Sequence, residues 1–384
     1  MIAHRFDGMN RRSFLRLAAI GGTGALVASS LAGCGKASPQ ISSAPAGSRS
    51  PNLDAIIDGA RKEGELNLSW GESSGGGGRS VQSWAESINR NYGLKLNVQF
   101  TPGPSMSDMA ARIVQEVAAG RPASSDVYFG SARATTTMVN QEVVQSVDWP
   151  SFATHLQKPD SLEATDLTVP VTADVPGISY NSNKVAPADV PKSLQDLLNP
   201  KYKGRMAGHV DASTYAEIAS DEIWGEQRTV DFVRQFASSV AGLLRSGEIE
   251  RVLTGEFDIF SVDGAGADVF RRQELGQPLG HVIPADVPMR EFRCMCIPKN
   301  SAHPNAAKLF LDHVMSREGQ DVLFANTYAD HPSVHGSKFA PFIDKQVPGV
   351  TFHDLTVAFN QRNGVDKMDR LTRMFVAIMR GTKS

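Results

Sequence analysis

Residues 65–100, with the sequence ELNLSWGESSGGGGRSVQSWAESINRNYGLKLNVQF, decide the fold class of this chain. Apolar and polar residues alternate over 65–70 and again over 94–100, as they do in strands, whereas the apolar residues over 81–92 have helical spacing. The same succession continues on both sides, with helices expected over 53–63 and 106–119 and a short strand over 126–129. Strands joined by helices in this order predict a parallel sheet with crossover helices, and therefore an α/β fold.

A second succession of helices and strands follows a hinge. The extended segments 167–171 and 177–181 meet around Asp174-Val-Pro176, and proline-punctuated segments of this kind suit a connection between two sheets. Beyond them we expect helices over 193–198, 214–223, 229–238, 248–254, 305–315, 317–325 and 367–380, and strands over 205–208, 257–262 and 291–297. Because the chain is longer than one hydrophobic core usually holds, we predict two lobes, each a mainly parallel sheet flanked by helices. Lobe I takes residues 52–173 and 291–384, and lobe II takes residues 174–290.

The first 33 residues have the features of an export signal. Asn10-Arg-Arg-Ser-Phe-Leu-Arg16 is a twin-arginine signature, a mildly apolar stretch follows over 17–31, and Leu31-Ala-Gly-Cys34 resembles the lipobox of bacterial lipoproteins. That resemblance implies cleavage before Cys34 and attachment of lipid to its thiol. The alternative is a membrane-spanning helix, but the apolar stretch is shorter than the roughly 20 residues that such a helix needs.

The composition of the remaining chain excludes some classes of function. Residues 34–51 are rich in Ser, Ala, Pro and Gly, which predicts a flexible tether. Removing residues 1–33 takes away four arginines and one aspartate, so the net charge falls from −2 to about −5, and nucleic acid is not an expected partner. Cys294 and Cys296 lie two apart on one expected strand, where their separation exceeds disulfide geometry, so we predict two buried thiols and no metal site.

Four stretches of the chain together resemble one protein family. They are Ala60-Arg-Lys-Glu-Gly-Glu-Leu66; Tyr180-Asn-Ser-Asn-Lys-Val185 with Pro191-Lys-Ser-Leu-Gln-Asp-Leu-Leu-Asn-Pro-Lys-Tyr-Lys-Gly204; Thr254-Gly-Glu-Phe-Asp258; and Ile297-Pro-Lys-Asn-Ser-Ala-His-Pro-Asn-Ala-Ala-Lys-Leu-Phe-Leu311 with Ser316-Arg-Glu-Gly-Gln320. In this order, over nearly the whole mature chain, they look like the type II periplasmic binding proteins, and within them the subfamily of ferric-iron and related small-solute receptors.

The resemblance implies two α/β lobes joined by hinge strands, with a small solute held in the cleft between them. It also implies that the protein delivers this solute to the permease and ATPase of an ABC importer. Such a receptor is exported, needs no cofactor and is not an enzyme. Together with the lipobox-like segment, the resemblance implies a lipid anchor at Cys34 on the outer face of the cytoplasmic membrane. We expect a monomer. Iron-binding members typically use two adjacent tyrosines, but the corresponding stretch here, Val262-Asp-Gly-Ala-Gly-Ala-Asp-Val-Phe270, has none. The family's metal residues therefore cannot be carried over, and ferric iron remains an alternative.

The glycine-rich loop after the first expected strand is a candidate ligand site. Glycines let the backbone approach a ligand, and the N-terminus of the following helix offers free N–H groups to an anion. The residues that we assign to the site here are Glu72, Ser73, Ser74, Gly75 and Arg79. Gly71-Glu-Ser-Ser-Gly75 also matches the G-x-S-x-G nucleophile elbow, which makes an exported serine hydrolase using Ser73 an alternative. Only about 20 folded residues precede Ser73, too few to build an oxyanion hole, so we expect it to line a cleft.

Other turns are expected at the same cleft, because ligands bind at the carboxyl ends of strands where the sheet order changes. They contribute Ser131, Arg133, Tyr180, Ser213, Thr214, Asp263 and Gly264, and the returning hinge strand contributes Arg290. Arg79, Arg133 and Arg290 favour a carboxylate or phosphate. Trp70, Glu72 and Asp263 favour an amine or a sugar. We predict that the solute is a small anion, although these residues leave its charge open. After the receptor and the hydrolase, the third class of function considered is an adhesin or scaffold without a ligand.

Overall fold

The computed structural model of the chain describes residues 50–245, 247–263 and 266–381. The expected export signal over 1–33, Cys34 and most of the tether over 34–51 lie outside the described residues. Within the described part, no helix combines the length and the apolar composition that crossing a membrane requires.

The first lobe is built on the strands predicted near the start of the folded chain. β1 (Glu65–Trp70) pairs in parallel with β2 (Asn97–Pro102), and a bridge between Leu68 and Val127 leads to β3 (Tyr128–Ser131). The helices of this region are α1 (Pro51–Glu63), α2 (Gly77–Tyr92), α3 (Met106–Ala118) and α4 (Ala132–Asn140). The alternation predicted from residues 53–129 is confirmed, whereas α4 was not predicted.

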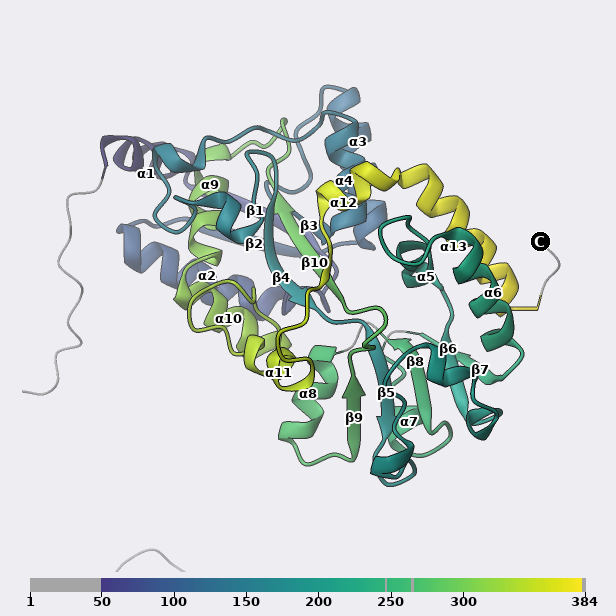
Figure 1. Ribbon diagram of the computed structural model, residues 1–384. Helices are drawn as coiled ribbons and strands as arrows, with labels where there is room; N and C mark the ends of the chain where they lie inside the picture. The colour runs from purple at the N-terminus through teal and green to yellow at the C-terminus, as the bar shows by residue number, and fades with distance from the viewer. Residues whose placement is uncertain (1–49, 246, 264–265, 382–384) are drawn as a thin grey trace, which may run out of the picture. The chain divides into compact units, whose positions relative to one another are not determined.

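A strand that returns from the second lobe runs through the middle of the first (Figure 1). β10 (Met289–Cys296) pairs antiparallel with β3 on one side and with β4 (Val169–Asp174) on the other, and in parallel with the short β11 (His353–Leu355). Cys294 and Cys296 on this strand are buried free thiols, as predicted.

The second lobe has its own sheet, with the strand order β7-β6-β8-β5-β9. β6 is parallel to β7 and β8, whereas β5 is antiparallel to β8 and β9, so the sheet is mixed. Its strands are β5 (Gly177–Asn181), β6 (Met206–His209), β7 (Val240–Leu244), β8 (Ile259–Asp263) and β9 (Leu279–Val282). Its helices are α5 (Ser213–Ile218), α6 (Glu226–Ala237), α7 (Glu250–Leu253) and α8 (Gly266–Glu274). The helix predicted over 193–198 is a 3-10 turn at Gln195–Leu198.

Two crossings of the chain connect the sheets, from β4 to β5 and from β9 to β10. The first coincides with the hinge predicted around Asp174. There the Oδ1 atom of Asp174 accepts hydrogen bonds from the N–H groups of Val175, at 2.8 Å, and Ala267, at 3.0 Å. Burial raises the pKa of this carboxyl group to about 7. A titratable group therefore lies at the point where the chain passes between the lobes.

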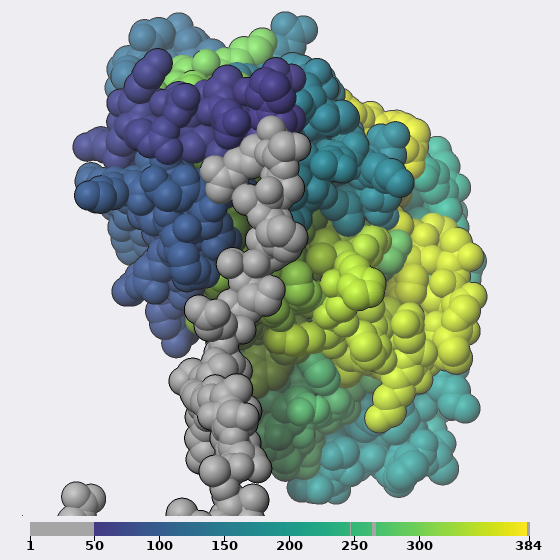
Figure 2. Space-filling view, turned by 90° about the vertical axis from the view of Figure 1, so that its left-hand side faces the viewer, coloured from purple at the N-terminus to yellow at the C-terminus, as the bar shows by residue number. Residues whose placement is uncertain are grey.

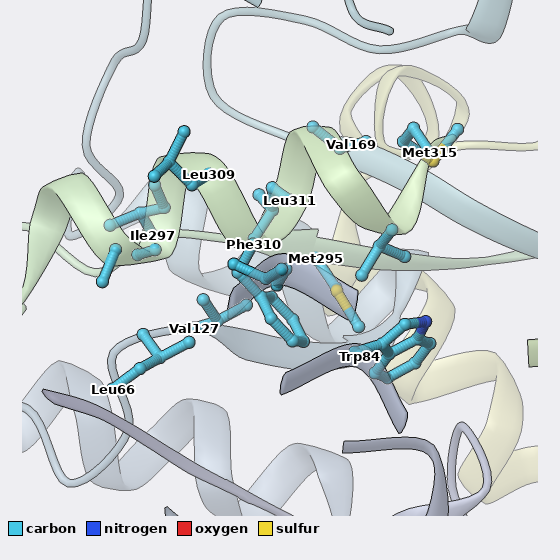
Figure 3. Packing of buried hydrophobic residues seen from close by; sticks show 14 of the residues in the cluster. Leu66, Trp84, Val127, Val169, Met295, Ile297, Leu309, Phe310, Leu311 and Met315 are labelled. Atoms are coloured by element: carbon cyan, nitrogen blue, oxygen red, sulfur yellow. The ribbon is translucent and has the colours of Figure 1, made fainter. Parts of the chain in front are cut away.

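The core of the first lobe forms between its strands and the helices α2, α9 (Pro304–Val314) and α10 (Arg317–Thr327) (Figure 3). Trp84 and Phe310 are fully buried and pack edge to face, with ring centroids 5.5 Å apart. The indole N–H of Trp84 donates to the carbonyl oxygen of Gly319 at 2.9 Å, so its burial leaves no polar atom unsatisfied. Residues more than 200 positions apart thus form one core.

The C-terminal helix packs on the second lobe. α12 (Val357–Asn363) follows β11, and α13 (Val365–Met379) then buries Leu371 and Phe375 in the core of the second sheet. The rings of Phe375 and Tyr215 lie 6.1 Å apart. This packing differs from the expected division, which placed all of 291–384 in lobe I. The apolar stripe of a helix predicts that it is buried, but the stripe does not specify which apolar surface it covers.

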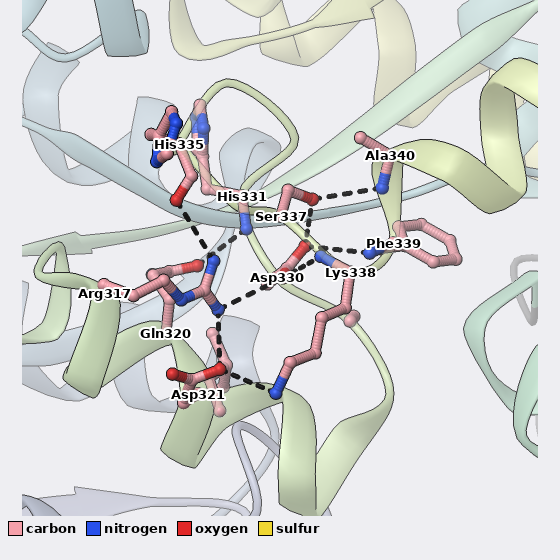
Figure 4. A network of polar contacts seen from close by, with 12 residues as sticks. Arg317, Gln320, Asp321, Asp330, His331, His335, Ser337, Lys338, Phe339 and Ala340 are labelled. Carbon is pink, nitrogen blue, oxygen red and sulfur yellow. Dashed lines mark hydrogen bonds and ion pairs between the residues drawn. The ribbon is translucent and has the colours of Figure 1, made fainter.

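A polar network holds the chain between α10 and α11 (Ala340–Gln346) against the first lobe (Figure 4). The fully buried carboxylate of Asp330 accepts from the Ser337 hydroxyl at 2.5 Å and the Lys338 N–H at 2.8 Å, and it lies 3.6 Å from Arg317. A buried charge that is hydrogen-bonded and near a cation costs far less than an isolated one. In Figure 2 this green-to-yellow part of the chain fills the middle of the visible face.

Candidate functional site

A cavity of about 540 Å³ lies where both lobes and the returning hinge strand meet. Its walls come from five parts of the chain. They are the start of α3 (Ser105, Met106, Ser107), the start of α4 (Ser131, Ala132, Arg133), α5 with the turn before it (Asp211, Ser213, Glu217), β10 (Glu291, Arg293) and the β11–α12 region (Leu355, Asn360). The first two turns follow β2 and β3, at the carboxyl ends of strands, where ligands are expected. A larger cavity of about 640 Å³, between residues 160–170 and 352–362, is lined by none of the predicted ligand-binding residues.

Arg133 connects the two lobes across this cavity. Its guanidinium forms an ion pair with Glu217 on α5 and donates to the Thr372 hydroxyl of α13 at 3.1 Å and the Ser213 carbonyl at 3.4 Å. Burial lowers the pKa of Arg133, but the nearby carboxylates, Glu217 first among them, together outweigh burial, and the net shift of the pKa is upward. Burial raises the pKa of Glu217 to about 6, against the effect of Arg133. Arg133 thus favours the charged form of Glu217, while burial of the carboxylate opposes it.

The arginine that β10 directs to the cavity is Arg293, and not the predicted Arg290. Arg290 binds Asp354 through two hydrogen bonds of 2.6 Å and lies 3.8 Å from Glu163, outside the cavity lining. Side chains three positions apart on a strand point to opposite faces, so the two arginines cannot both face one cavity. Arg293 forms an ion pair with Glu291, whose carboxylate raises the pKa of the guanidinium.

Three of the turns expected at the cleft open a helix, and two of these openings already hold a carboxylate. Glu72 accepts a hydrogen bond from the N–H of Gly78 at 3.3 Å, at the start of α2. Asp211 accepts from both the N–H and the hydroxyl of Ser213 at 3.0 Å, at the start of α5. An acidic side chain satisfies the positive end of the helix dipole, which leaves less for an anionic solute. Only the third opening, at Ser131, is free of a carboxylate cap and lines the cavity.

The glycine-rich loop itself lies outside the cavity lining. Ser73 and Arg79 are exposed, and Ser74 is half-buried. Gly75 has a φ of +56° and packs so closely on the Phe129 ring that a side chain there would touch it. The glycines therefore serve a tight turn over the core in this structure.

The remaining predicted residues are not gathered at the cavity. Tyr180 on β5 packs its ring over Gly280 of the neighbouring strand, and burial raises its pKa. Thr214 follows Ser213 in α5 but does not line the cavity. Asp263 is the last residue of β8, and its side chain is not described by the structure. Gly264 lies outside the described residues.

Sequence reasoning missed Asn360, which belongs to the cavity lining. It lies on α12 and is 2% exposed, and its amide nitrogen donates to the Thr356 carbonyl oxygen at 2.8 Å. Its side-chain oxygen Oδ1 is buried without a hydrogen-bond donor. A buried acceptor without a partner is costly, and because this oxygen is itself inaccessible, it offers no free acceptor to the cavity. No sequence signal distinguishes this asparagine, because α12 packs here only through long-range contacts.

The ligand set of a ferric site is not gathered in the described part of the chain. All six tyrosines are described, and none lines the cavity. Tyr128 donates to the Met106 carbonyl oxygen at 3.0 Å, and Tyr202 donates to the Asp189 carbonyl oxygen at 2.6 Å. The described residues also contain no group of three or more His, Cys, Asp or Glu side chains placed to hold a metal ion.

Relatives in sequence are distant. A Haemophilus influenzae protein of uncharacterised function is 28% identical over 153 residues, which cover 38% of this chain and 44% of that protein. The chain therefore matches less than half the length of this relative. The Fe(3+)-binding periplasmic protein of Serratia marcescens is 22% identical over 295 residues, which cover 70% of this chain and 81% of that protein.

Relatives in structure share the fold. Iron-bound HitA from Pseudomonas aeruginosa has a TM-score of 0.62 at 16% identity, covering 81% of this chain and 99% of that one. AfuA from Actinobacillus pleuropneumoniae, solved with fructose-6-phosphate, has a TM-score of 0.60 at 18% identity, covering 82% and 98%. The predicted α/β fold of a type II periplasmic binding protein is thus confirmed. Since residues 125–363 also match the family described as bacterial extracellular solute-binding proteins, the chain belongs to that family.

Proposed function

We propose that this protein is the extracytoplasmic receptor of an ABC-type importer and holds a small solute in the 540 Å³ cavity. The observation that carries the proposal is the origin of the cavity walls: both lobes and the hinge strand contribute, so closure of the lobes encloses whatever lies there. The lobes meet through the Arg133–Glu217 ion pair at the same place. A receptor of this kind releases its solute to the permease when the lobes separate.

Within the site, Ser131, Arg133 and Ser213 keep the ligand-binding role predicted for them. Arg293, Glu217, Glu291 and Asn360 join them, because all four line the same cavity. The residues of the glycine-rich loop, Glu72 to Arg79, bind solute only if the lobes adopt another arrangement.

The proposal includes export and anchoring. The twin-arginine signature and the lipobox-like Leu31-Ala-Gly-Cys34 support a lipid anchor at Cys34 on the outer face of the cytoplasmic membrane. Family membership supports an exported location independently of that signal.

Binding without turnover is part of the proposal. Ser73 is exposed on a loop outside the cavity, and only α1 and β1 precede it in the described chain. A nucleophilic serine needs a neighbouring base and oxyanion donors. We therefore expect a fluorophosphonate probe to leave Ser73 unlabelled; covalent labelling of Ser73 would support the hydrolase instead.

Ferric iron is the second candidate solute, because a curated relative is named for Fe(3+) and the similar solved structures include iron-bound HitA. The cavity offers carboxylates from Asp211, Glu217 and Glu291 but no phenolate. Iron bound with an exogenous anion remains compatible with this lining. Metal analysis of the purified protein distinguishes iron from a metal-free organic solute.

Native mass spectrometry of the protein purified without refolding tests the proposal. We expect a mass increment from a copurified solute, and loss of that increment in Ser107→Trp, which places a large ring at an exposed position of the cavity rim. Gln82→Trp, on the exposed face of α2, is the matched control and should keep the solute. A solute retained equally by both variants would place the site elsewhere, and no solute or thermal stabilisation with any metabolite would contradict a receptor role.

A further inference from the structure

Three charged side chains meet where the short strand β11 lies against β10 and the loop over 159–168. Arg290 of β10 donates from Nε and Nη2 to the two carboxylate oxygens of Asp354 on β11, both at 2.6 Å. The same nitrogen, Nη2, lies 3.8 Å from the Oε1 atom of Glu163 in the loop. Two carboxyl groups therefore share one guanidinium, and the three side chains are only 21–29% exposed.

The contact between the two carboxyl groups requires a proton. A side-chain hydrogen bond joins Glu163 to Asp354, and because ionised carboxylates are acceptors only, one of the two groups must carry an O–H. The Oε2 atom of Glu163 is buried, and no donor among the described residues reaches it. A buried acceptor without a partner is costly, whereas a protonated Glu163 has a donor to offer to Asp354, whose charge stays with Arg290.

The groups around Glu163 favour the protonated form. Burial and the neighbouring charge of Asp354 raise the pKa of Glu163 to about 7, against the lowering effect of Arg290. The Cys294 thiol and the His331 ring also lie near this cluster, but burial raises the pKa of Cys294 to about 12 and lowers that of His331 to about 4. Both are therefore neutral around pH 7, and neither competes for the proton or compensates a charge.

The other ionisable groups nearby are mainly acidic. The 640 Å³ cavity is lined by both members of the carboxyl pair, and its remaining ionisable lining residues are Asp160, Asp166, Glu222, His353 and Arg362. Arg362 is already held by Glu222 through hydrogen bonds of 3.1 and 3.0 Å, and Asp344 of α11 is a further carboxylate that acts on Arg290. A second negative charge at Glu163 therefore competes with Asp354 for Arg290.

The two sides of this contact are held unequally. The loop of Glu163 is fixed to the first lobe, because Leu162 is buried in its core and the indole N–H of Trp149 donates to the Thr165 carbonyl oxygen at 3.0 Å. β11 has three residues and lies at the edge of its sheet, where it pairs with β10 alone. Repulsion between the two carboxylates should therefore displace β11 rather than the loop.

β11 leads directly to the candidate site. Leu355 at its end and Asn360 on α12 line the 540 Å³ cavity, and α13 then continues in the core of the second lobe. A change in the attachment of β11 consequently affects both the cavity lining and a segment through which the chain passes to the second lobe.

We propose that Glu163 and Asp354 share one proton at neutral pH, and that loss of this proton loosens β11 from the first lobe. With the proton in place, Asp354 keeps Arg290 to itself. Without it, two charged carboxylates in contact compete for one guanidinium and repel each other. The attachment is complete below about pH 4, the ordinary pKa of a glutamate side chain, and is lost as the pH rises through 7. This property goes beyond the proposed receptor function and does not depend on the identity of the solute.

Carbon-13 NMR of the full chain, with labelled glutamate carboxyl carbons, tests the shared proton. Glu163 is assigned as the resonance missing from Glu163→Gln, and we expect its titration midpoint near pH 7. Asp354→Asn removes the like charge and should lower this midpoint by about one pH unit or more. Glu222→Gln is the matched control, since Glu222 lines the same cavity but pairs with Arg362, and it should leave the midpoint unchanged. A midpoint below about pH 5, or one that Asp354→Asn does not move, overturns the inference.

Hydrogen–deuterium exchange tests the attachment of β11. The measured quantity is the protection of peptides covering 353–360, corrected for the intrinsic exchange rate at each pH. With a midpoint near 7, loss of the proton should lower this protection about 30-fold between pH 5.5 and pH 8.5. Peptides from α2, far from the pair in sequence, report any change in global stability.

The variants distinguish the proton from a general effect of pH. Glu163→Gln cannot ionise, so the corrected protection of 353–360 should be equal at both pH values, whereas Glu222→Gln should behave like the parent. If Glu163→Gln does not fold, Asp354→Asn takes its place, because it also removes the pair of like charges. Equal protection at both pH values in the parent, or the same loss in a folded variant of the pair, contradicts the inference.

Discussion

Replacing Arg133 by alanine should shift the protein from the closed to the open arrangement of its lobes. Arg133 lies on α4 of the first lobe, and its partners Glu217, Thr372 and Ser213 lie on α5 and α13. Without the guanidinium, Glu217 keeps its carboxylate at 13% exposure with no cation beside it. Breaking a buried pair from one side costs about 3–5 kcal/mol. Opening hydrates Glu217, so we expect the cost to fall on the closed state.

The expected shift is measurable as a distance between the lobes. A loss of about 3 kcal/mol lowers the closed-to-open ratio roughly 100-fold, because each 1.4 kcal/mol is a factor of ten. Spin labels on Lys95→Cys and Arg234→Cys, both exposed and on different lobes, report that distance by double electron–electron resonance. A Cys34→Ser background leaves only Cys294 and Cys296, which are buried, and burial raises the pKa of the Cys294 thiol to about 12.

A matched control separates closure from general loss of charge. Arg370 pairs with Glu226, but both belong to the second lobe and are 52% and 39% exposed. Exposed pairs contribute at most about 1 kcal/mol, and this one does not cross the cavity, so Arg370→Ala should leave the distance distribution unchanged. If Arg133→Ala has the same distribution as the parent, or if both variants change alike, the ion pair does not hold the lobes together.

Three further predictions concern the anchor, the hinge and the second core. Cys34→Ala should leave the chain soluble after cell disruption or unprocessed; normal processing with continued fractionation in membranes would place the anchor elsewhere. Burial raises the pKa of Asp174 to about 7, so the folded state binds the proton of this carboxyl group more tightly than the unfolded state does. The stabilisation that comes from this proton is complete below about pH 4 and is lost as the pH rises through 7. Asp174→Asn keeps the accepting oxygen but does not titrate. Between pH 4 and 8 its free energy of unfolding, measured with urea, should therefore rise by up to about 4 kcal/mol relative to that of the parent protein. If the free energies of unfolding of the two proteins change in parallel with pH, this prediction is refuted. Phe375→Ala should lower the free energy of unfolding by about 3–5 kcal/mol, because the ring is fully buried against the second sheet; a loss below 1 kcal/mol would show that α13 is not part of that core.

The local pattern of apolar residues predicted most helices and strands correctly, but it did not predict which of them pack together. The strand and helix periods of residues 53–129 predicted the first sheet, since burial of one face depends mainly on near neighbours in sequence. The destination of α13 was not predictable in the same way. Its stripe around Phe375 fits any apolar surface, and only the folded chain brings it to Tyr215.

The candidate site shows the same limit at single residues. Helix openings were predicted as anion sites from glycine and serine positions, but Glu72 and Asp211 fold back on two of them, which the sequence alone does not reveal. Arg290 and Arg293 were equivalent as charges near a hinge. The pleat of β10 and its pairing with β11 decide that Arg290 meets Asp354 and Arg293 faces the cavity.

The sequence by itself determined the α/β class, the two-lobed resemblance, the hinge near Asp174 and the buried state of Cys294 and Cys296, because each follows from local periodicity or from an ordered set of short motifs. Only the tertiary structure decided which charges share a cavity. The pairing of Arg133 with Glu217 and the position of Asn360 in the same cavity lining join segments more than 80 residues apart. Such contacts depend on how the lobes and the C-terminal helices pack rather than on any local pattern.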